Sequence, residues 1–203
     1  MNSGISFNSD KHIYRLENRE MLNVTRIIGG NLDDFLFNGA TMDNIRKAGK
    51  FGTLVHDLCH EFNETGKIKT TDKEARRYVN GWVQLLENKQ WSPYKSEIIV
   101  YSRKYKFAGR LDSLLRDKSN FIHLVDIKVR SSIPVTVKLQ TAGYKIAHEE
   151  MTGEKISYRW CVNLTGKGIG YVLYPLKGLM DAHTFICKAI SMQWDMTWAG
   201  KNL

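Results

Sequence analysis

The chain has 203 residues, of which 42% are hydrophobic and 25% are charged, and its formal net charge is +9 with a pI near 9.4. This composition excludes an intrinsically disordered chain, and no apolar run approaches the roughly 18 to 20 residues that span a bilayer. The excess of Lys and Arg favours a polyanionic partner, although charge alone identifies none.

One domain covering residues 1–203 is expected, because no linker rich in Pro, Gly or Ser divides the chain. The N-terminus lacks the charged and apolar regions of a signal peptide. The three cysteines, Cys59, Cys161 and Cys187, are far apart in the sequence and odd in number. This usage favours a reducing compartment, so we expect a cytoplasmic protein.

The first half of the chain reads mainly as helix. Residues 12–16 resemble a short strand, and 22–28 resemble a strand or the start of a helix. Apolar residues then recur at helical spacing over about 42–62. Residues 71–74, Thr-Asp-Lys-Glu, resemble a capping box that opens a second amphipathic helix over about 75–86.

The second half is rich in strand-forming residues. Five strands are expected, at residues 96–102, 105–116, 121–129, 156–164 and 169–176. A polar turn at 117–120 makes the second and third of them a hairpin. Pro134 opens a helix after the third, and a last helix covers about 180–198. This order predicts an α/β fold with a mixed central sheet flanked by helices.

Two of these strands carry charged residues among apolar ones, namely Asp112, and Asp126 with Lys128. A buried carboxylate costs several kcal/mol unless it is paired or binds a metal. Asp126 and Lys128 share a strand face, and the hairpin can bring Asp112 beside them. Mg²⁺ or Mn²⁺ would compensate the second acid, with the Ile127 carbonyl as another ligand. An Asp–Lys pair at an exposed sheet edge is the alternative.

Five motifs occur in a fixed order along the chain. They are Asn-Val-Thr-Arg-Ile-Ile-Gly at 23–29, Gly-Thr-Leu-Val-His at 52–56, Gly-Arg-Leu-Asp at 109–112, Val-Asp-Ile-Lys at 125–128, and Gln140-x-x-x-Tyr144. This set resembles the PD-(D/E)XK nuclease superfamily, and specifically its RecB-like exonuclease branch, which includes phage exonucleases and the mitochondrial genome maintenance exonuclease. The resemblance covers about residues 24–144. An isolated Asp-x-Lys would be weak, but the ordered set is specific.

The resemblance implies a fold and a metal site. The fold would be a restriction-endonuclease-like core, with a sheet at about 95–176 and an N-terminal helical segment at about 40–90 arching over the site. The implied metal ligands are His56, Asp112, Asp126 and the Ile127 carbonyl. Mg²⁺ or Mn²⁺ is expected, and the His nitrogen suits Mn²⁺ somewhat better.

The resemblance also implies roles for further residues. Lys128 would orient or help deprotonate the attacking water. Gln140 and Tyr144, four apart on a helix, would line the site or contact the DNA backbone. Glu97 matches an additional acid of the family, although a glutamate at a strand end is usually solvated.

The implied activity is that of a divalent-metal-dependent deoxyribonuclease. We expect a DNA exonuclease acting on single-stranded or frayed ends in recombination, repair or phage DNA metabolism, in a bacterial or phage-infected cell. The alternatives are a structure-specific flap or branch endonuclease of the same fold and a non-catalytic DNA-binding module. Three scattered cysteines argue against an iron–sulfur cluster, and no Walker motif is present. A helicase, annealing or single-strand-binding partner would therefore be a separate protein.

Three patterns leave alternatives open. The basic residues Arg103, Lys104, Lys106 and Arg110 form either a solvated hairpin turn or a ridge that contacts DNA phosphates. The His56 and His60 pair has zinc-protease spacing, but residue 57 is not Glu and no third ligand is evident. Tryptophans 82 and 91 either pack in the core or stack on bases, whereas 194 and 198 are expected in the core.

Overall fold

The computed structural model describes residues 4–8, 11–29, 41–130 and 132–198. The strands are β1 (Ile5–Asn8), β2 (Ile13–Leu16), β3 (Arg19–Asn23), β4 (Ser92–Ser102), β5 (Phe107–Arg116), β6 (Ile122–Lys128), β7 (Tyr158–Leu164) and β8 (Tyr171–Pro175). The helices are α1 (Val24–Ile27), α3 (Met42–Thr65), α4 (Lys73–Lys89), α5 (Val137–Thr152) and α6 (Asp181–Trp198).

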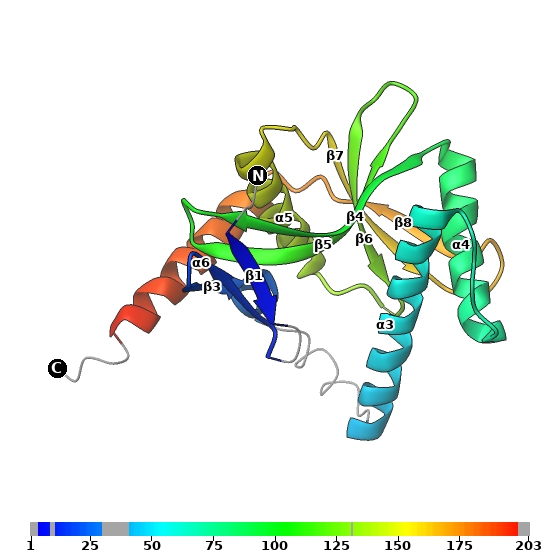
Figure 1. The fold of residues 1–203 in the computed structure, drawn as a ribbon, viewed down its shortest axis with the longest axis horizontal. Helices are drawn as coiled ribbons and strands as arrows, with labels where there is room; N and C mark the ends of the chain where they lie inside the picture. Colours follow the sequence, from blue (N-terminus) through cyan, green and yellow to red (C-terminus); the bar gives the residue numbers. More distant parts are fainter. Residues whose placement is uncertain (1–3, 9–10, 30–40, 131, 199–203) are drawn as a thin grey trace.

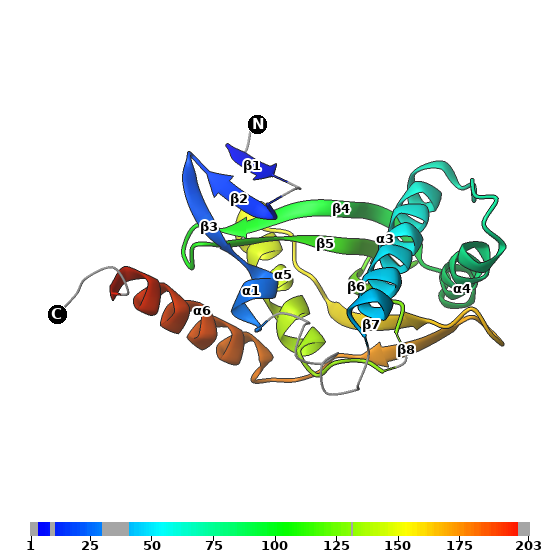
Figure 2. The ribbon, with the colours of Figure 1, turned by 90° about the horizontal axis from the view of Figure 1, so that it is seen from below.

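The eight strands form one mixed sheet with helices on both faces, which confirms the predicted fold class. One core lies between the sheet and α1, α5 and α6, and a second lies between the sheet and α3 and α4. Figures 1 and 2 show α3 and α4 at one end of the molecule and α6 at the other. No helix in the part of the chain that the structure describes is long and apolar enough to cross a membrane.

The central strand β5 pairs along both of its edges. Along one edge it pairs antiparallel with β4 over its whole length. Along the other it pairs with β3, in parallel, only at 107–108, and with β6, antiparallel, only at 113–116. The predicted hairpin with its turn at 117–120 is confirmed, because Asp117 and Asn120 close it by backbone hydrogen bonds.

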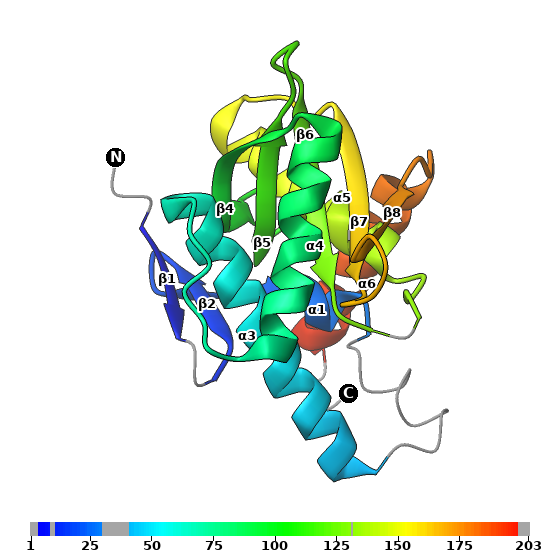
Figure 3. The same cartoon turned by 90° about the vertical axis from the view of Figure 1, so that its right-hand side faces the viewer.

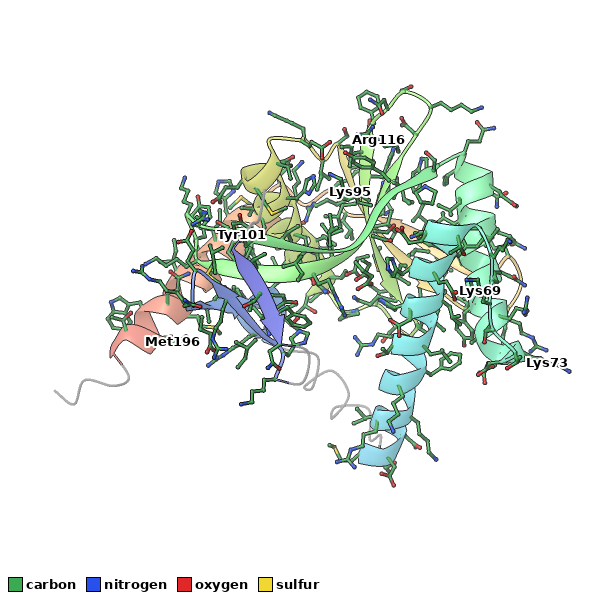
Figure 4. The ribbon with its side chains drawn as sticks, viewed as in Figure 1. Lys69, Lys73, Lys95, Tyr101, Arg116 and Met196 are labelled. Atoms are coloured by element: carbon green, nitrogen blue, oxygen red, sulfur yellow. The ribbon has the colours of Figure 1, made fainter. Side chains whose placement is uncertain are left out.

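Helix α3 is long and only partly packed. Val55, Leu58 and Cys59 bury its second half against the core, whereas nearly every residue over 41–50 is exposed. The first turns of α3 therefore project from the body of the molecule (Figure 3). Figure 4 marks the two ends of the molecule with Lys73, at the start of α4, and Met196, near the end of α6.

Two predicted helix starts are wrong by one to three residues. The N-cap of α4 is Asp72 instead of Thr71, because the Asp72 carboxylate accepts hydrogen bonds from the amides of Glu74 and Ala75. Helix α5 starts at Val137, since a turn at 134–137 comes first and leaves Val135 74% exposed.

The tryptophans divide between core and surface. Trp82 is fully buried and donates its indole N–H to Asn63, and Trp91 is 9% exposed against His123. Both therefore pack in the core rather than form a channel for bases. The expectation that Trp194 is buried is wrong, because α6 extends past the core and leaves this residue 62% exposed. The side chain of residue 198 lies outside those described.

Candidate functional site

The candidate site lies at a gap in the backbone pairing along one edge of β5. Along the edge of β5 that faces β3 and β6, residues 109–112 lie between the two paired stretches. Asp112 and Asp126 are the first residues beyond the last β5–β6 pair, Ser113 with Val125. The Asp112 carboxylate replaces the missing ladder contact, since its Oδ2 accepts a 2.7 Å hydrogen bond from the Ile127 amide. The strands thus separate at the two predicted acids.

His56, Glu97 and Asp112 come together at this gap. Their potential ligand atoms all lie within 4.8 Å of one another. His56 Nδ1 is 3.7 Å from Asp112 Oδ2. Buried neighbours on α3, Val55 and Cys59, fix the helix against the core and leave His56 in the cleft. The three donors, one nitrogen and two carboxylates, fit a hard or borderline divalent cation.

Glu97 reaches the site because of an irregularity in β4. The register of β4 against β5 shifts by one residue between Pro93 and Lys95, and the pairing that follows places Glu97 opposite Asp112. Glu97 has φ of +52°, a left-handed conformation that a glutamate adopts only at a cost in free energy. Its side chain is 17% exposed and forms an ion pair with Arg110, whose Nε is 2.9 Å from a Glu97 carboxylate oxygen. The alternative of a solvated strand-end glutamate is therefore wrong.

Asp126 and Lys128 lie beside this group and form a pair of their own. Lys128 Nζ is 2.6 Å from Asp126 Oδ2, and Asp126 is 1% exposed. Among the residues that the structure describes, no donor makes a well-directed hydrogen bond to either Asp126 oxygen. A buried carboxylate with free acceptor capacity fits an additional metal ligand or a partner for an ordered water.

A hydrogen-bonded row leads from Lys128 to α5. Lys128 Nζ donates to Gln140 Oε1 at 3.3 Å, and Gln140 Nε2 donates to the Tyr144 hydroxyl at 3.0 Å. Gly109 makes room for the tyrosine, because a Cβ there would lie 2.7 Å from the Tyr144 ring. The structure thus brings together the predicted Lys128, Gln140 and Tyr144 in one continuous arrangement.

Charge is poorly balanced in this cleft. Burial and the nearby Asp112 raise the pKa of Glu97 to about 7, although Arg110 opposes the shift. Burial also raises the pKa of both Asp112 and Asp126. Burial and the Lys128 charge lower the pKa of His56 to about 4, which leaves a neutral imidazole at neutral pH. Neutral His and carboxylates are the forms that bind a cation.

His56, Glu97, Asp112 and Lys128 line a cleft of about 880 Å³, and the buried Asp126 lies beside it. One wall is the N-terminal half of α3, where Ala48, Gly49, Gly52 and Thr53 leave space beside His56. The opposite wall comes from the β1–β3 strands and the segment before α5. Figure 2 shows α3 and the β1–β3 strands on either side of β4 and β5. The cleft is open to solvent.

The other predicted residues lie in different places. Arg110 is at the cleft, paired with Glu97. Arg103, Lys104 and Lys106 occupy the β4–β5 turn, and Lys106 is about 20 Å along the strand from Asp112. Arg103 pairs with Glu17 at 2.9 Å. His60 bonds Ser96 Oγ at 2.6 Å and is outside the group formed by His56, Glu97 and Asp112.

Comparison with solved structures identifies the fold. The chain resembles a proposed exonuclease from Eubacterium rectale with a TM-score of 0.57 and 13% identity, over 95% of this chain and 86% of that one. The fold is nuclease-like. A second match, SSO0001, has a TM-score of 0.42 and 13% identity over 89% of this chain and 77% of that one. No family model matches the chain, and no curated protein matches its sequence.

Sequence reasoning missed one part of this site. His12, Tyr14 and Asn23, from the strands that precede the motifs, line the same cleft as His56 and Asp112. The sequence predicted a strand at 12–16 and a strand or helix start at 22–28, but β1 and the pairing of β3 with β5 were not foreseen. Glu17 and Asn18, both with positive φ, form the turn between β2 and β3.

Proposed function

We propose that the chain is a divalent-metal-dependent DNA exonuclease that hydrolyses phosphodiester bonds from single-stranded or frayed ends. The observation that carries the proposal is the convergence of His56, Glu97 and Asp112 within 4.8 Å at a break in a nuclease-like sheet. The positive net charge and a cleft open to solvent are consistent with a nucleic-acid substrate.

The proposed cation ligands are His56, Glu97 and Asp112, with Asp126 and the Ile127 carbonyl as further donors. The free acceptor capacity of the buried Asp126 and the raised pKa values of the acids support this assignment. A divalent cation held there would supply Lewis-acid activation of water and of the phosphoryl group.

Lys128 is proposed to act as a hydrogen-bond donor. Burial lowers its pKa, but the charges of Asp126 and Asp112 outweigh burial and hold the pKa above the usual value. Lys128 therefore remains an ammonium at neutral pH, able to orient water and to stabilise negative charge on a phosphoryl oxygen. Gln140 would fix the direction of the ammonium, and Tyr144 would fix Gln140.

The test is hydrolysis of linear single strands labelled at the 5′ or 3′ end, of duplex, and of closed single-stranded circles, in Mg²⁺, Mn²⁺ or EDTA. We expect metal-dependent loss of linear strands, intact circles, and no hydrolysis by Asp126→Ala. The first label released gives the polarity. Cleaved circles would indicate an endonuclease of the same fold, and tight binding without hydrolysis in any metal would indicate a DNA-binding module.

A further inference from the structure

The strands β1, β2 and β3 form an N-terminal meander that lies outside the motifs at about 24–144. β1 pairs with β2 and β2 with β3, all antiparallel. The meander is fixed to the sheet where Leu22 and Asn23 of β3 pair with Phe107 and Ala108 of β5. This attachment places the meander at the end of β5 that leads into the cleft, so its side chains are positioned relative to Asp112.

Three aromatic rings gather on the cleft side of the meander. The Phe7 and Tyr14 rings are stacked, with centroids 4.5 Å apart and 24° between planes. The His12 ring is nearly perpendicular to both, 5.3 Å from Phe7 and 5.9 Å from Tyr14. Tyr14 is buried and Phe7 half-buried, whereas His12 is exposed and lines the cleft. The two inner rings therefore hold the accessible ring of His12 in a fixed orientation.

The backbone of His12 supports the same conclusion. Its φ is +53°, which is uncommon for any residue other than glycine. The Asn23 side chain donates to the His12 carbonyl at 3.4 Å and helps to hold this conformation. A ring is thus kept at the cleft in a turn where glycine or asparagine would fit with less strain.

Arg110 connects the rings to the proposed metal ligands. Its Nε is 2.9 Å from Glu97, and its guanidinium carbon is 5.6 Å from the Phe7 ring centroid. Burial and the Arg110 charge lower the pKa of His12, so the imidazole is neutral at neutral pH. A neutral ring is suited to stacking on a base, while the neighbouring guanidinium can contact the phosphate attached to that base.

We propose that the His12 ring is a stacking subsite for one unpaired nucleobase of the substrate strand. This inference rests on the proposed function, since it requires a nucleic acid in the cleft. Bases inside a duplex are stacked on both faces and cannot add a protein ring without unstacking. The subsite would therefore favour single strands and frayed ends, and it would tolerate any base because every base has an aromatic face.

The experiment measures binding of a short labelled single strand by fluorescence anisotropy, in Ca²⁺ and in EDTA, with one abasic nucleotide moved through each position. Wild type is expected to lose affinity at one position, by about 5- to 20-fold. His12→Asn removes the ring yet suits the left-handed turn, and should lower the affinity for the intact strand by a similar factor. It should also erase the dependence on position, whereas His12→Phe should retain it.

The matched control is Lys11→Ala, which removes an exposed charge from the same turn and should keep the wild-type positional profile. A flat profile for wild type, or an unchanged profile for His12→Asn, would overturn the subsite. Wild-type hydrolysis in Mn²⁺ is measured in parallel. Hydrolysis together with a flat profile removes only the subsite, whereas absence of both binding and hydrolysis removes the proposed function as well.

Discussion

Two groups of polar side chains on the same sheet balance charge in opposite ways. At one end, three hydrogen-bond donors and a histidine surround the Glu154 carboxylate, and we call this set the Glu154 cluster. Its members and their distances to the Glu154 carboxylate are the Tyr94 hydroxyl at 2.6 Å, Lys95 Nζ at 3.0 Å, Arg116 Nη2 at 3.4 Å and His148 Nε2 at 3.6 Å. The hydrogen bond from Tyr94, together with Lys95, lowers the pKa of Glu154.

The cleft has the reverse balance. Glu97, Asp112 and Asp126 share it, and the pKa of each is raised. Figure 4 labels Lys95 and Arg116 of the Glu154 cluster, which lie on β4 and β5, the strands that also carry Glu97 and Asp112. Glu154, in the segment after α5, is thus held in its charged form by its neighbours, whereas burial outweighs the partners of the three acids on the sheet. Acids whose charged form is disfavoured by burial destabilise the metal-free fold, which is the arrangement expected where a cation binds.

The largest expected effect comes from removing the lysine of the cleft, with removal of a lysine of the Glu154 cluster as the control. Lys128→Ala should lower the rate of nucleotide release by about 10²-fold or more, because a donor to the reacting phosphate is lost. Binding of Mn²⁺ should persist, since the proposed ligands remain. Lys95→Ala, which removes the corresponding lysine from the Glu154 cluster, is the control and should leave the rate unchanged. Equal rate losses in the two variants would contradict the assignment of Lys128.

The second expected effect is a gain in stability when the charge of Glu97 is removed. The pKa of Glu97 is raised from 4.5 to about 7 in the fold. The stability that protonated Glu97 contributes is therefore fully present below about pH 4.5 and is lost as the pH rises through 7. Glu97→Gln should therefore stabilise the metal-free protein at pH 8 by up to about 3 kcal/mol.

Thermal unfolding in EDTA at pH 8 and at pH 4 tests this expectation, and the gain should vanish at pH 4. Mn²⁺ should raise the Tm of wild type and have little effect on Glu97→Gln, because one proposed ligand is missing. A variant less stable than wild type at pH 8 would show that the charge of Glu97 is already compensated.

The smallest expected effect concerns the compensated carboxylate. Because the pKa of Glu154 is lowered, its contribution is present above about pH 4.5 and is lost as pH falls through the folded pKa. Glu154→Gln should destabilise the protein at pH 7 by about 1–2 kcal/mol, through weaker hydrogen bonds from Tyr94 and Lys95. Urea unfolding should show this loss at pH 7 and a smaller one at pH 3, with unaltered hydrolysis at pH 7.

The parts of the site that depend on residues close together in the sequence could be predicted. The hairpin turn at 117–120, the helical spacing of Gln140 and Tyr144, and the alternation of Asp126 and Lys128 all follow from short-range periodicity. Helix boundaries were less accurate, because capping depends on which side chain reaches the free amides, as at Asp72.

The remaining features depend on contacts between distant segments. Glu97 faces Asp112 because the register of β4 against β5 shifts by one residue between Pro93 and Lys95, and the sequence gives no signal for that shift. The position of His12 depends on the pairing of β3 with β5 across more than eighty residues of chain. Neither contact leaves a periodic arrangement of hydrophobic residues, so it could not be predicted from a single sequence.

The hydrogen bond from the Ile127 amide to Asp112 gives the site a spectroscopic consequence. In most strands an amide proton reports only on the neighbouring strand, whereas this one lies 2.7 Å, donor to acceptor, from a carboxylate at the centre of the cleft. Protonation of Asp112, or arrival of a cation on it, must change the electron density around that proton. The Ile127 amide resonance is thus a built-in NMR reporter of what occupies the cleft, readable without a label on the ligand.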